Sequence, residues 1–236
     1  MTDVGMHLPA AVSAVVFDCD GTLVDSEPIH AKAISTVLAE YGVAIPAAEI
    51  MSRFTGYDNA RLIAELGTTA GIEWASDIDE RLDEACHALL LVEASAMPGA
   101  MAALEACRSA ELTLALASNS KRRLVTAMLG CTRLDRYFDD RLATRDRVAA
   151  PKPAADSYLL AAEYCAAPPS RCLAIEDSPA GVRAACAAGI TTIGYHPAGS
   201  TISAQALHAA GAVFVIEDLY RLATLIERRS LAASVD

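Results

Sequence analysis

Short, uninterrupted apolar runs alternate with longer helical segments along most of the chain, and this alternation limits the possible folds more than any other feature. The clear strand-like runs cover residues 13–19, 112–118, 172–177, 191–195 and 212–216, and a weaker one covers 140–144. Each run is continuously apolar, which is the pattern of strands that are covered on both faces. Strands separated by helices form right-handed βαβ units, so the sequence predicts an α/β fold with a Rossmann-like parallel sheet.

Capping signals mark where the helices between these strands begin. Ser178 is a predicted N-cap, and Pro179 stands at the first helical position after it. Ser120 is predicted to cap the helix that follows the second clear strand. Pro153 is predicted to open the helix after the weak strand, so that Lys152 lies where this helix begins.

Residues 27–96 interrupt the alternation, because they contain helical segments and no strand candidate. Ser26 is predicted to cap the first of these helices, and a helix that begins near Gly99 returns the chain to the sheet. We therefore expect an inserted α-helical unit at 27–96. The sheet-containing core would consist of residues 1–26 and 97–236.

Charge and cysteine usage narrow the class of protein. The chain has 30 acidic and 19 basic residues and a net charge of −11, and a nucleic-acid-binding protein needs a basic face that this sequence lacks. The cysteine count is seven, with no C-x-x-C pair, which favours reduced thiols over a disulfide framework or a zinc site.

The start of the chain gives no sign of export or membrane insertion. It has no basic n-region, and its apolar run is interrupted by Asp18, so the sequence predicts neither a signal peptide nor a membrane span. We expect a cytoplasmic monomer or homodimer with no nucleic-acid or membrane partner.

Polar side chains gather where the predicted strands end, which is the edge at which open parallel sheets bind ligands. They are Asp18, Asp20, Ser118, Asn119, Lys152, Glu176 and Asp177. Four clustered carboxylates repel one another unless a cation lies among them. An all-oxygen ligand set suits Mg²⁺, which often bridges to phosphate. The sequence therefore predicts a magnesium site that receives a small phosphorylated metabolite.

These residue types are also suited to phosphoryl transfer. A carboxylate such as Asp18 can attack as a nucleophile and form an aspartyl-phosphate. Lys152, the Ser118 hydroxyl and a metal ion would surround the equatorial oxygens with positive charge. Asp20, two residues from the nucleophile, is placed to protonate the leaving oxygen and later to activate water.

Four segments carry a resemblance to a known family. "DCDGTLVDSE" (18–27) looks like the first motif of the haloacid dehalogenase superfamily, and "LALASNS" (114–120) is similar to its second. "APKPAADSY" (150–158) resembles the third motif, and "LAIEDSPAGVRAACAAG" (173–189) the fourth. The helical insert after the first motif resembles the cap of the branch that includes β-phosphoglucomutase and many small phosphatases.

The resemblance implies a role for each matching residue. Asp18 would be the nucleophile, Asp20 the acid and base, and Ser118 and Lys152 the phosphoryl-binding residues, with Asn119 beside them. The implied Mg²⁺ ligands are Asp18, the backbone carbonyl of Asp20, Asp177 and, directly or through water, Glu176. True dehalogenases lack the second aspartate, so its presence here favours phosphoryl transfer.

The cap sequence bears on the choice between a phosphatase and a phosphosugar mutase. His30 stands where the mutase has a histidine tied to substrate binding, and "SNSK" (118–121) also resembles the mutase. The mutase holds the distal phosphate with a lysine directly before a glycine and an arginine three residues after it. Here Thr55 precedes Gly56 and Asn59 stands in place of the arginine. We therefore favour a phosphatase for a small, sugar-phosphate-like monoester, with a mutase as the alternative.

Several interpretations stay open at this stage. His30 is either an ordinary cap histidine or a substrate ligand, and Lys121 lies either on a helix surface or at the rim of the site. The loop that contains Arg53 and Gly56 either only connects two helices or touches the substrate. A non-catalytic phosphate-binding module is a third class of function, and the intact set of site residues argues against it.

Overall fold

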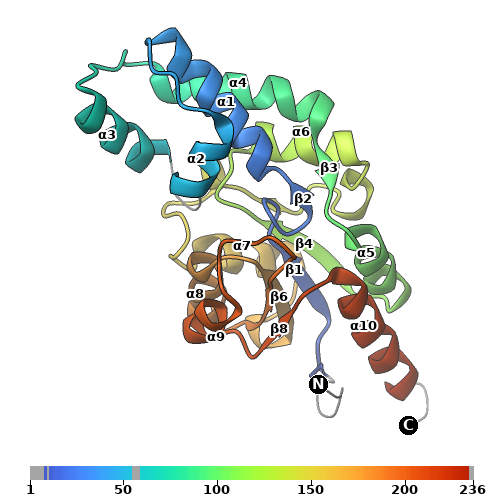
Figure 1. Cartoon of the computed structure of the whole chain (residues 1–236). Helices are drawn as coiled ribbons and strands as arrows, with labels where there is room; N and C mark the ends of the chain where they lie inside the picture. Colours follow the sequence, from blue (N-terminus) through green and yellow to red (C-terminus); the bar gives the residue numbers. More distant parts are fainter. Residues whose placement is uncertain (1–7, 10, 55–58, 234–236) are drawn as a thin grey trace.

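A six-stranded parallel sheet lies at the centre of the computed structural model, which describes residues 8–9, 11–54 and 59–233 (Figure 1). In spatial order the strands are β5 (Leu142–Ala143), β4 (Thr113–Ala117), β1 (Ala14–Phe17), β6 (Cys172–Glu176), β7 (Thr191–Tyr195) and β8 (Phe214–Ile216). β1 pairs in parallel with β4 on one side and with β6 on the other. The first strand of the chain is therefore central, and the polar residues that follow it lie between those that follow β4 and β6.

The predicted parallel α/β sheet is confirmed, since each of the six predicted runs contains one strand. The last strand is shorter than expected and begins at Phe214 instead of residue 212. The backbone N–H of Ala212 donates to the carbonyl of Leu207 and so closes the end of the preceding helix. The chain can extend into β8 only after this helix end is complete.

Helices cover both faces of the sheet. One face carries α5 (Ala100–Ser109), α6 (Arg122–Thr132) and α10 (Leu219–Ala233). The other carries α7 (Asp156–Tyr164) and α8 (Pro179–Ala187), with α9 (Ala204–Ala210) beside α8. Short 3₁₀ turns occupy Asp135–Tyr137, Arg145–Arg147 and Pro169–Arg171. Among the described residues, no helix has both the length and the apolar character needed to cross a bilayer.

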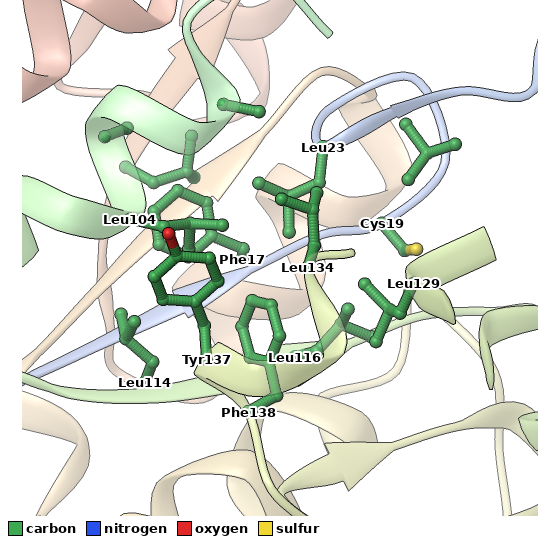
Figure 2. Close-up of a cluster of buried hydrophobic side chains, with 14 of the residues drawn as sticks. Phe17, Cys19, Leu23, Leu104, Leu114, Leu116, Leu129, Leu134, Tyr137 and Phe138 are labelled. Atoms are coloured by element: carbon green, nitrogen blue, oxygen red, sulfur yellow. The ribbon is translucent and has the colours of Figure 1, made fainter. Parts of the chain in front are cut away.

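The two faces of β1 pack against layers of different side-chain size. Val15 and Phe17 face the larger cluster, in which Phe17, Leu104, Leu116 and Phe138 come together (Figure 2). The opposite face contributes Ala14 and Val16 to a cluster that is mostly alanine. Small side chains let α7 and α8 approach the sheet closely, which explains how the alanine-rich composition of this chain still forms a packed core.

Four helices between β1 and α5 form a separate group at the end of the molecule opposite both chain termini (Figure 1). They are α1 (Glu27–Glu40), α2 (Ala47–Phe54), α3 (Asn59–Ala70) and α4 (Ile78–Glu93). Two small apolar clusters hold them together, one joining α1, α2 and α3 and the other joining α1 to α4. The predicted helices of 27–96 are thus present.

The expectation that 27–96 contains no strand was wrong. Ser95–Ala96 forms strand β3, which pairs antiparallel with β2 (Val24–Asp25). This two-residue ribbon joins the outgoing and returning chains between the sheet and the four helices. A two-residue strand is too short to leave an apolar period in the sequence, so the pattern could not reveal it.

Helix starts were predicted with mixed success. Ser178 is the N-cap of α8, and its Oγ accepts a hydrogen bond from the backbone N–H of Gly181 at 3.0 Å, as expected. Ser120 is not a cap, because α6 begins at Arg122. Ser26 does occupy the N-cap of α1, but its side chain makes no capping bond. Both hydroxyls are instead used in the site described below.

The helix predicted to begin at Pro153 begins three residues later, at Asp156. The backbone first makes a turn, in which the N–H of Ala154 donates to the carbonyl of Pro151 at 2.9 Å. Lys152 therefore lies in a loop and not at a helix start. This loop places Lys152 at the carboxyl end of the sheet.

Candidate active site

Lys152 and Asp18 form the buried centre of the site. The Lys152 Nζ donates to Asp18 Oδ1 at 2.5 Å, to Glu176 Oε1 at 2.5 Å and to the backbone carbonyl of Ala117 at 2.8 Å. These acceptors follow or end three neighbouring strands, β1, β6 and β4. All three ammonium protons are thus used, and burial between two carboxylates raises the pKa of Lys152, because the attraction outweighs the cost of desolvation.

Glu176 is oriented by a second set of contacts. Tyr158 donates its hydroxyl to Glu176 Oε1 at 2.8 Å, and Ser178 donates its hydroxyl to Oε2 at 3.1 Å. A Cβ at Gly181 would lie 1.8 Å from Glu176 Oε1, so only glycine leaves room for this carboxylate. Glu176 is completely buried and holds Lys152 in place.

Three carboxylates form a cluster that could hold a cation. One oxygen each of Asp18, Glu176 and Asp177 lie within 4.8 Å of one another. Burial raises the pKa of Asp18 to about 8 although Lys152 opposes the shift, and burial and the neighbouring acids raise the pKa of Asp177 well above its usual value. Buried acids with raised pKa values favour an added positive charge, and an all-oxygen donor set fits Mg²⁺.

Asp177 is positioned by residues of the turn after β1. The Thr22 hydroxyl donates to Asp177 Oδ1 at 3.2 Å. Gly21 has a φ of +74°, and a Cβ there would lie 2.3 Å from Asp177 Oδ2. The Gly-Thr pair thus allows the carboxylates after β1 and β6 to approach each other.

Four side chains donate to the carboxylate of Asp20. Oδ1 accepts from Ser26 Oγ at 2.8 Å and is 3.0 Å from His30 Nε2. Oδ2 accepts from Ser118 Oγ at 3.1 Å and from Ser120 Oγ at 2.8 Å. Burial alone would raise the pKa of Asp20, but the hydrogen bonds from His30 and the serines outweigh it and lower the pKa to about 2. In this arrangement Asp20 is a carboxylate.

His30 reaches the site from the first helix of the inserted group. Its Nε2 faces Asp20, and its Nδ1 lies 3.2 Å from the thiol sulfur of Cys86 on α4. Burial would lower the pKa of His30, but the bonds to Asp20 and Cys86 raise it well above its ordinary value. The structure thus places His30 beside Asp20, and its role as a substrate ligand stays a prediction.

Ser118 and Asn119 follow β4, as predicted, and their contacts differ from those expected of phosphate ligands. Ser118 donates to Asp20 and accepts from the backbone N–H of Ser120 at 2.9 Å. Asn119 Oδ1 accepts from the backbone N–H of Lys152 at 2.8 Å, and its Nδ2 donates to the Lys152 carbonyl at 3.4 Å. Asn119 therefore fixes the loop that carries Lys152.

Arg53, a second residue predicted to contact substrate, does not join this network. Arg53 forms an ion pair with Glu49 of its own helix at 2.7 Å, and its guanidinium lies 4.9 Å from the ring centre of Phe54. Gly56 lies outside the described residues. Lys121 pairs with Asp83 of α4.

Sequence reasoning missed five residues of the site. They are Thr22, Ser26, Cys86, Ser120 and Tyr158. Ser26 and Ser120 were seen but assigned to helix caps, because a serine before a helix usually has that role. Thr22 and Tyr158 stood in quoted motifs without a role assigned to them, whereas Cys86 lies inside helix α4 and carries no local signal.

Taken together, the contacts support nucleophilic chemistry with proton transfer. The buried Asp18 carboxylate accepts from an ammonium group and belongs to a cluster of possible cation ligands, and the Asp20 carboxylate has four donors. This combination can attack an electrophilic phosphorus, stabilise the negative charge that develops, and exchange a proton with a leaving oxygen or water.

Known proteins resemble both the sequence and the fold. Residues 12–189 match the haloacid dehalogenase-like hydrolase family. The chain is 31% identical to a phosphorylated carbohydrates phosphatase of Thermotoga maritima, over 87% of this chain and 94% of that protein. It is 32% identical to SUPPRESSOR OF QUENCHING 1, chloroplastic, of Arabidopsis thaliana over 88% of this chain, and this match spans only 20% of the plant protein.

A solved structure agrees with the fold over nearly its whole length. It is a hydrolase of the same family from Deinococcus radiodurans, crystallised with bound phosphate and sodium. The TM-score is 0.77 at 32% identity, and the alignment covers 94% of this chain and 98% of that chain.

Proposed function

The chain belongs to the haloacid dehalogenase-like hydrolases and is a phosphatase, and we propose that it hydrolyses a small phosphorylated carbohydrate through an aspartyl-phosphate on Asp18. The proposal includes dependence on Mg²⁺. One observation carries it: Asp18 is buried, accepts from the Lys152 ammonium at 2.5 Å and shares a cluster of carboxylates with Glu176 and Asp177.

Asp18 performs the first step as a carboxylate. One of its oxygens attacks phosphorus, the bond from phosphorus to the substrate oxygen breaks, and that oxygen leaves with a proton. Lys152 and the Ser118 hydroxyl are proposed to bind the phosphoryl oxygens. Asp18, Asp177, Glu176 and the backbone carbonyl of Asp20 would hold Mg²⁺. The bound ion supplies the positive charge that lets an anionic carboxylate and an anionic phosphate approach each other.

Asp20 is proposed to donate a proton to the leaving oxygen in the first step and to accept one from water in the second. Water attacks the phosphorus of the aspartyl-phosphate in the second step, and Asp20 takes a proton from that water. The carboxylate form, held by four donors, is ready for this role. For the first step Asp20 must carry a proton, which requires that some of these donors turn to other acceptors when substrate enters.

The helices of 27–96 are proposed to act as the cap that covers the substrate. His30 already joins this segment to Asp20, and Arg53 and Gly56 are proposed to contact the part of the substrate beyond the phosphate. A cap of this kind excludes bulk water during the reaction and opens for release of product. The Thermotoga relative, named for phosphorylated carbohydrates, supports a sugar phosphate as substrate.

Phosphate release from a panel of phosphorylated sugars, polyols and sugar acids, with Mg²⁺ and with a chelator, tests the proposal. We expect release from at least one sugar phosphate, loss of release with the chelator, and loss in Asp18→Asn but not in Asp25→Asn, which changes an exposed aspartate of β2. Release that is unchanged in Asp18→Asn would contradict the mechanism. Isomerisation of a hexose 1-phosphate with a trace of bisphosphate, without free phosphate, would identify a mutase instead.

A further inference from the structure

Helix α4 carries a buried carboxylate that the proposed reaction does not use. The Asp83 side chain is 7% exposed and faces the beginning of α6, where Lys121 Nζ lies 2.5 Å from its Oδ2 and Arg123 Nη2 lies 3.8 Å from the same oxygen. This oxygen has no aligned hydrogen-bond partner among the described residues. The negative charge of Asp83 is therefore balanced by Lys121 and Arg123, which lie at the start of α6 in the core.

The position of this pair relates it to Asp20. Lys121 directly follows Ser120, and Ser118 and Ser120 donate to Oδ2 of Asp20. One helical turn beyond Asp83, Cys86 contacts His30, which faces Oδ1 of Asp20. Adjacent turns of α4 thus contact Lys121 and His30, whose neighbouring serines and imidazole hold the two oxygens of Asp20.

We propose that Asp83 is a positioning residue of the phosphatase reaction. Its ion pair with Lys121 docks α4 onto loop 118–121 and so fixes the two serine hydroxyls that hold Asp20. This inference rests on the proposed function. It gives Lys121 a structural task at the rim of the site, as the cation that joins the helical cap to the loop after β4.

A second aspartate of α4, Asp79, contacts the same lysine from a more exposed position. Asp79 Oδ2 lies 3.6 Å from the same Lys121 Nζ, but its side chain is 56% exposed. Exposed ion pairs contribute little, because water and salt screen them. A buried carboxylate that loses its partner keeps the cost of desolvation, so Asp83 and Lys121 should act as a unit whereas Asp79 should not.

The first experiment compares kcat/KM of Asp83→Asn and Asp79→Asn for a sugar phosphate and for p-nitrophenyl phosphate. Phosphoryl transfer from a sugar phosphate needs a proton on the leaving sugar oxygen. Transfer from p-nitrophenyl phosphate does not, because p-nitrophenolate leaves without one. We expect Asp83→Asn to lower kcat/KM for the sugar phosphate about tenfold, which is part of the roughly 10²–10⁴-fold that general-acid catalysis contributes, and for p-nitrophenyl phosphate less than about twofold. Asp79→Asn should leave both values within about twofold of the wild type.

The second experiment measures hydrogen exchange of the amides in α4 and loop 118–121 and needs no activity. We expect faster exchange in Asp83→Asn than in Asp79→Asn. The double variant Asp83→Asn/Lys121→Met should exchange no faster than the faster single variant, because the two residues act together. If Asp83→Asn fails to fold, recovery of a folded protein in the double variant supports the pair, and failure of both contradicts it.

Three results would overturn the inference: equal exchange in the two aspartate variants, equal loss of kcat/KM for both substrates in Asp83→Asn, or independent effects of Asp83 and Lys121. A wild-type protein that releases no phosphate from any ester would refute the proposed function. The exchange measurement would then still decide whether Asp83 docks α4, so the two failures can be told apart.

Discussion

The sheet core and the helices proposed as a cap hold their candidate side chains in different ways. In the core, Lys152 contacts acceptors from three strands, and Glu176 among them is held further by Tyr158 and Ser178. In the cap, Arg53 pairs only one turn away within its own helix. The core network fixes its side chains from several strands at one place, whereas the Arg53 pair stays within one helix. A fold of this kind can change substrate without changing mechanism.

The largest expected effect is a loss of activity when the buried Lys152 is replaced, compared with the exposed Lys32. Lys152→Met removes the only ammonium described next to Asp18, and we expect kcat/KM to fall about 10³-fold, the loss typical of one preorganised donor in a buried site. Lys32→Met is the control, because Lys32 is 51% exposed and pairs with Glu93. Steady-state kinetics with p-nitrophenyl phosphate measures both. Comparable losses in the two variants would remove the distinction between core and surface.

The next largest effect is a change in stability, which should have opposite signs at two glycines with different surroundings. A Cβ at Gly181 would lie 1.8 Å from Glu176 Oε1, whereas one at Gly130 in α6 would meet nothing within 4 Å. We expect Gly181→Ala to lower the free energy of unfolding by about 2 kcal/mol and to reduce activity, as overpacking displaces Glu176. Gly130→Ala should raise the free energy of unfolding by about 0.5–1 kcal/mol, because alanine favours a helix more than glycine does. Urea unfolding measures both, and a neutral Gly181→Ala would show that Glu176 can move freely.

A third prediction concerns pH and the metal. Burial raises the pKa of Asp18 to about 8 in the folded chain, against an ordinary value of 3.8 for an aspartate. Between these values the folded, metal-free protein keeps a proton that the unfolded chain has lost, so stability falls as pH rises. The raised pKa of His30 acts in the same direction above its ordinary value.

Thermal unfolding of the metal-free protein at pH 5 and pH 8 measures this slope. We expect a lower Tm at pH 8 and a larger gain from Mg²⁺ there, since protons no longer compete for the carboxylates. The slope should be shallower in Asp18→Asn. A Tm that rises between pH 5 and pH 8 without metal would contradict the assignment of Asp18 as the buried acid.

The smallest effect tests the cap. Arg53→Ala removes an exposed pair within one helix, so we expect a stability loss of about 0.3–0.5 kcal/mol. If Arg53 contacts substrate, KM for the best sugar phosphate should rise several-fold while kcat stays near the wild-type value. Arg108→Ala is the matched control, because Arg108 also forms an exposed pair within its helix. An unchanged KM in Arg53→Ala would remove it from the substrate site.

The difference between the core and the helices of 27–96 also explains which site residues the sequence could predict. Asp18, Lys152 and Asp177 were found because carboxyl ends of parallel strands meet at one edge, so position in the chain determines position in space. Ser120 was misassigned, and Ser26 holds its predicted N-cap position without a capping bond, because local capping and long-range bonding use the same residue type. Cys86 could not be found, since its contact with His30 depends on how two helices pack.

The aspartyl-phosphate is the central claim, and trapping it on Asp18 tests the claim most directly. In Asp20→Asn, p-nitrophenyl phosphate can still phosphorylate the enzyme, because its leaving group needs no proton, but hydrolysis of the intermediate lacks its base. Rapid quenching in acid and mass spectrometry of peptides should find one added phosphoryl group on the peptide that contains Asp18, and none in Asp18→Asn/Asp20→Asn. A phosphoryl group on another residue, or turnover that persists in Asp18→Asn, would contradict the account.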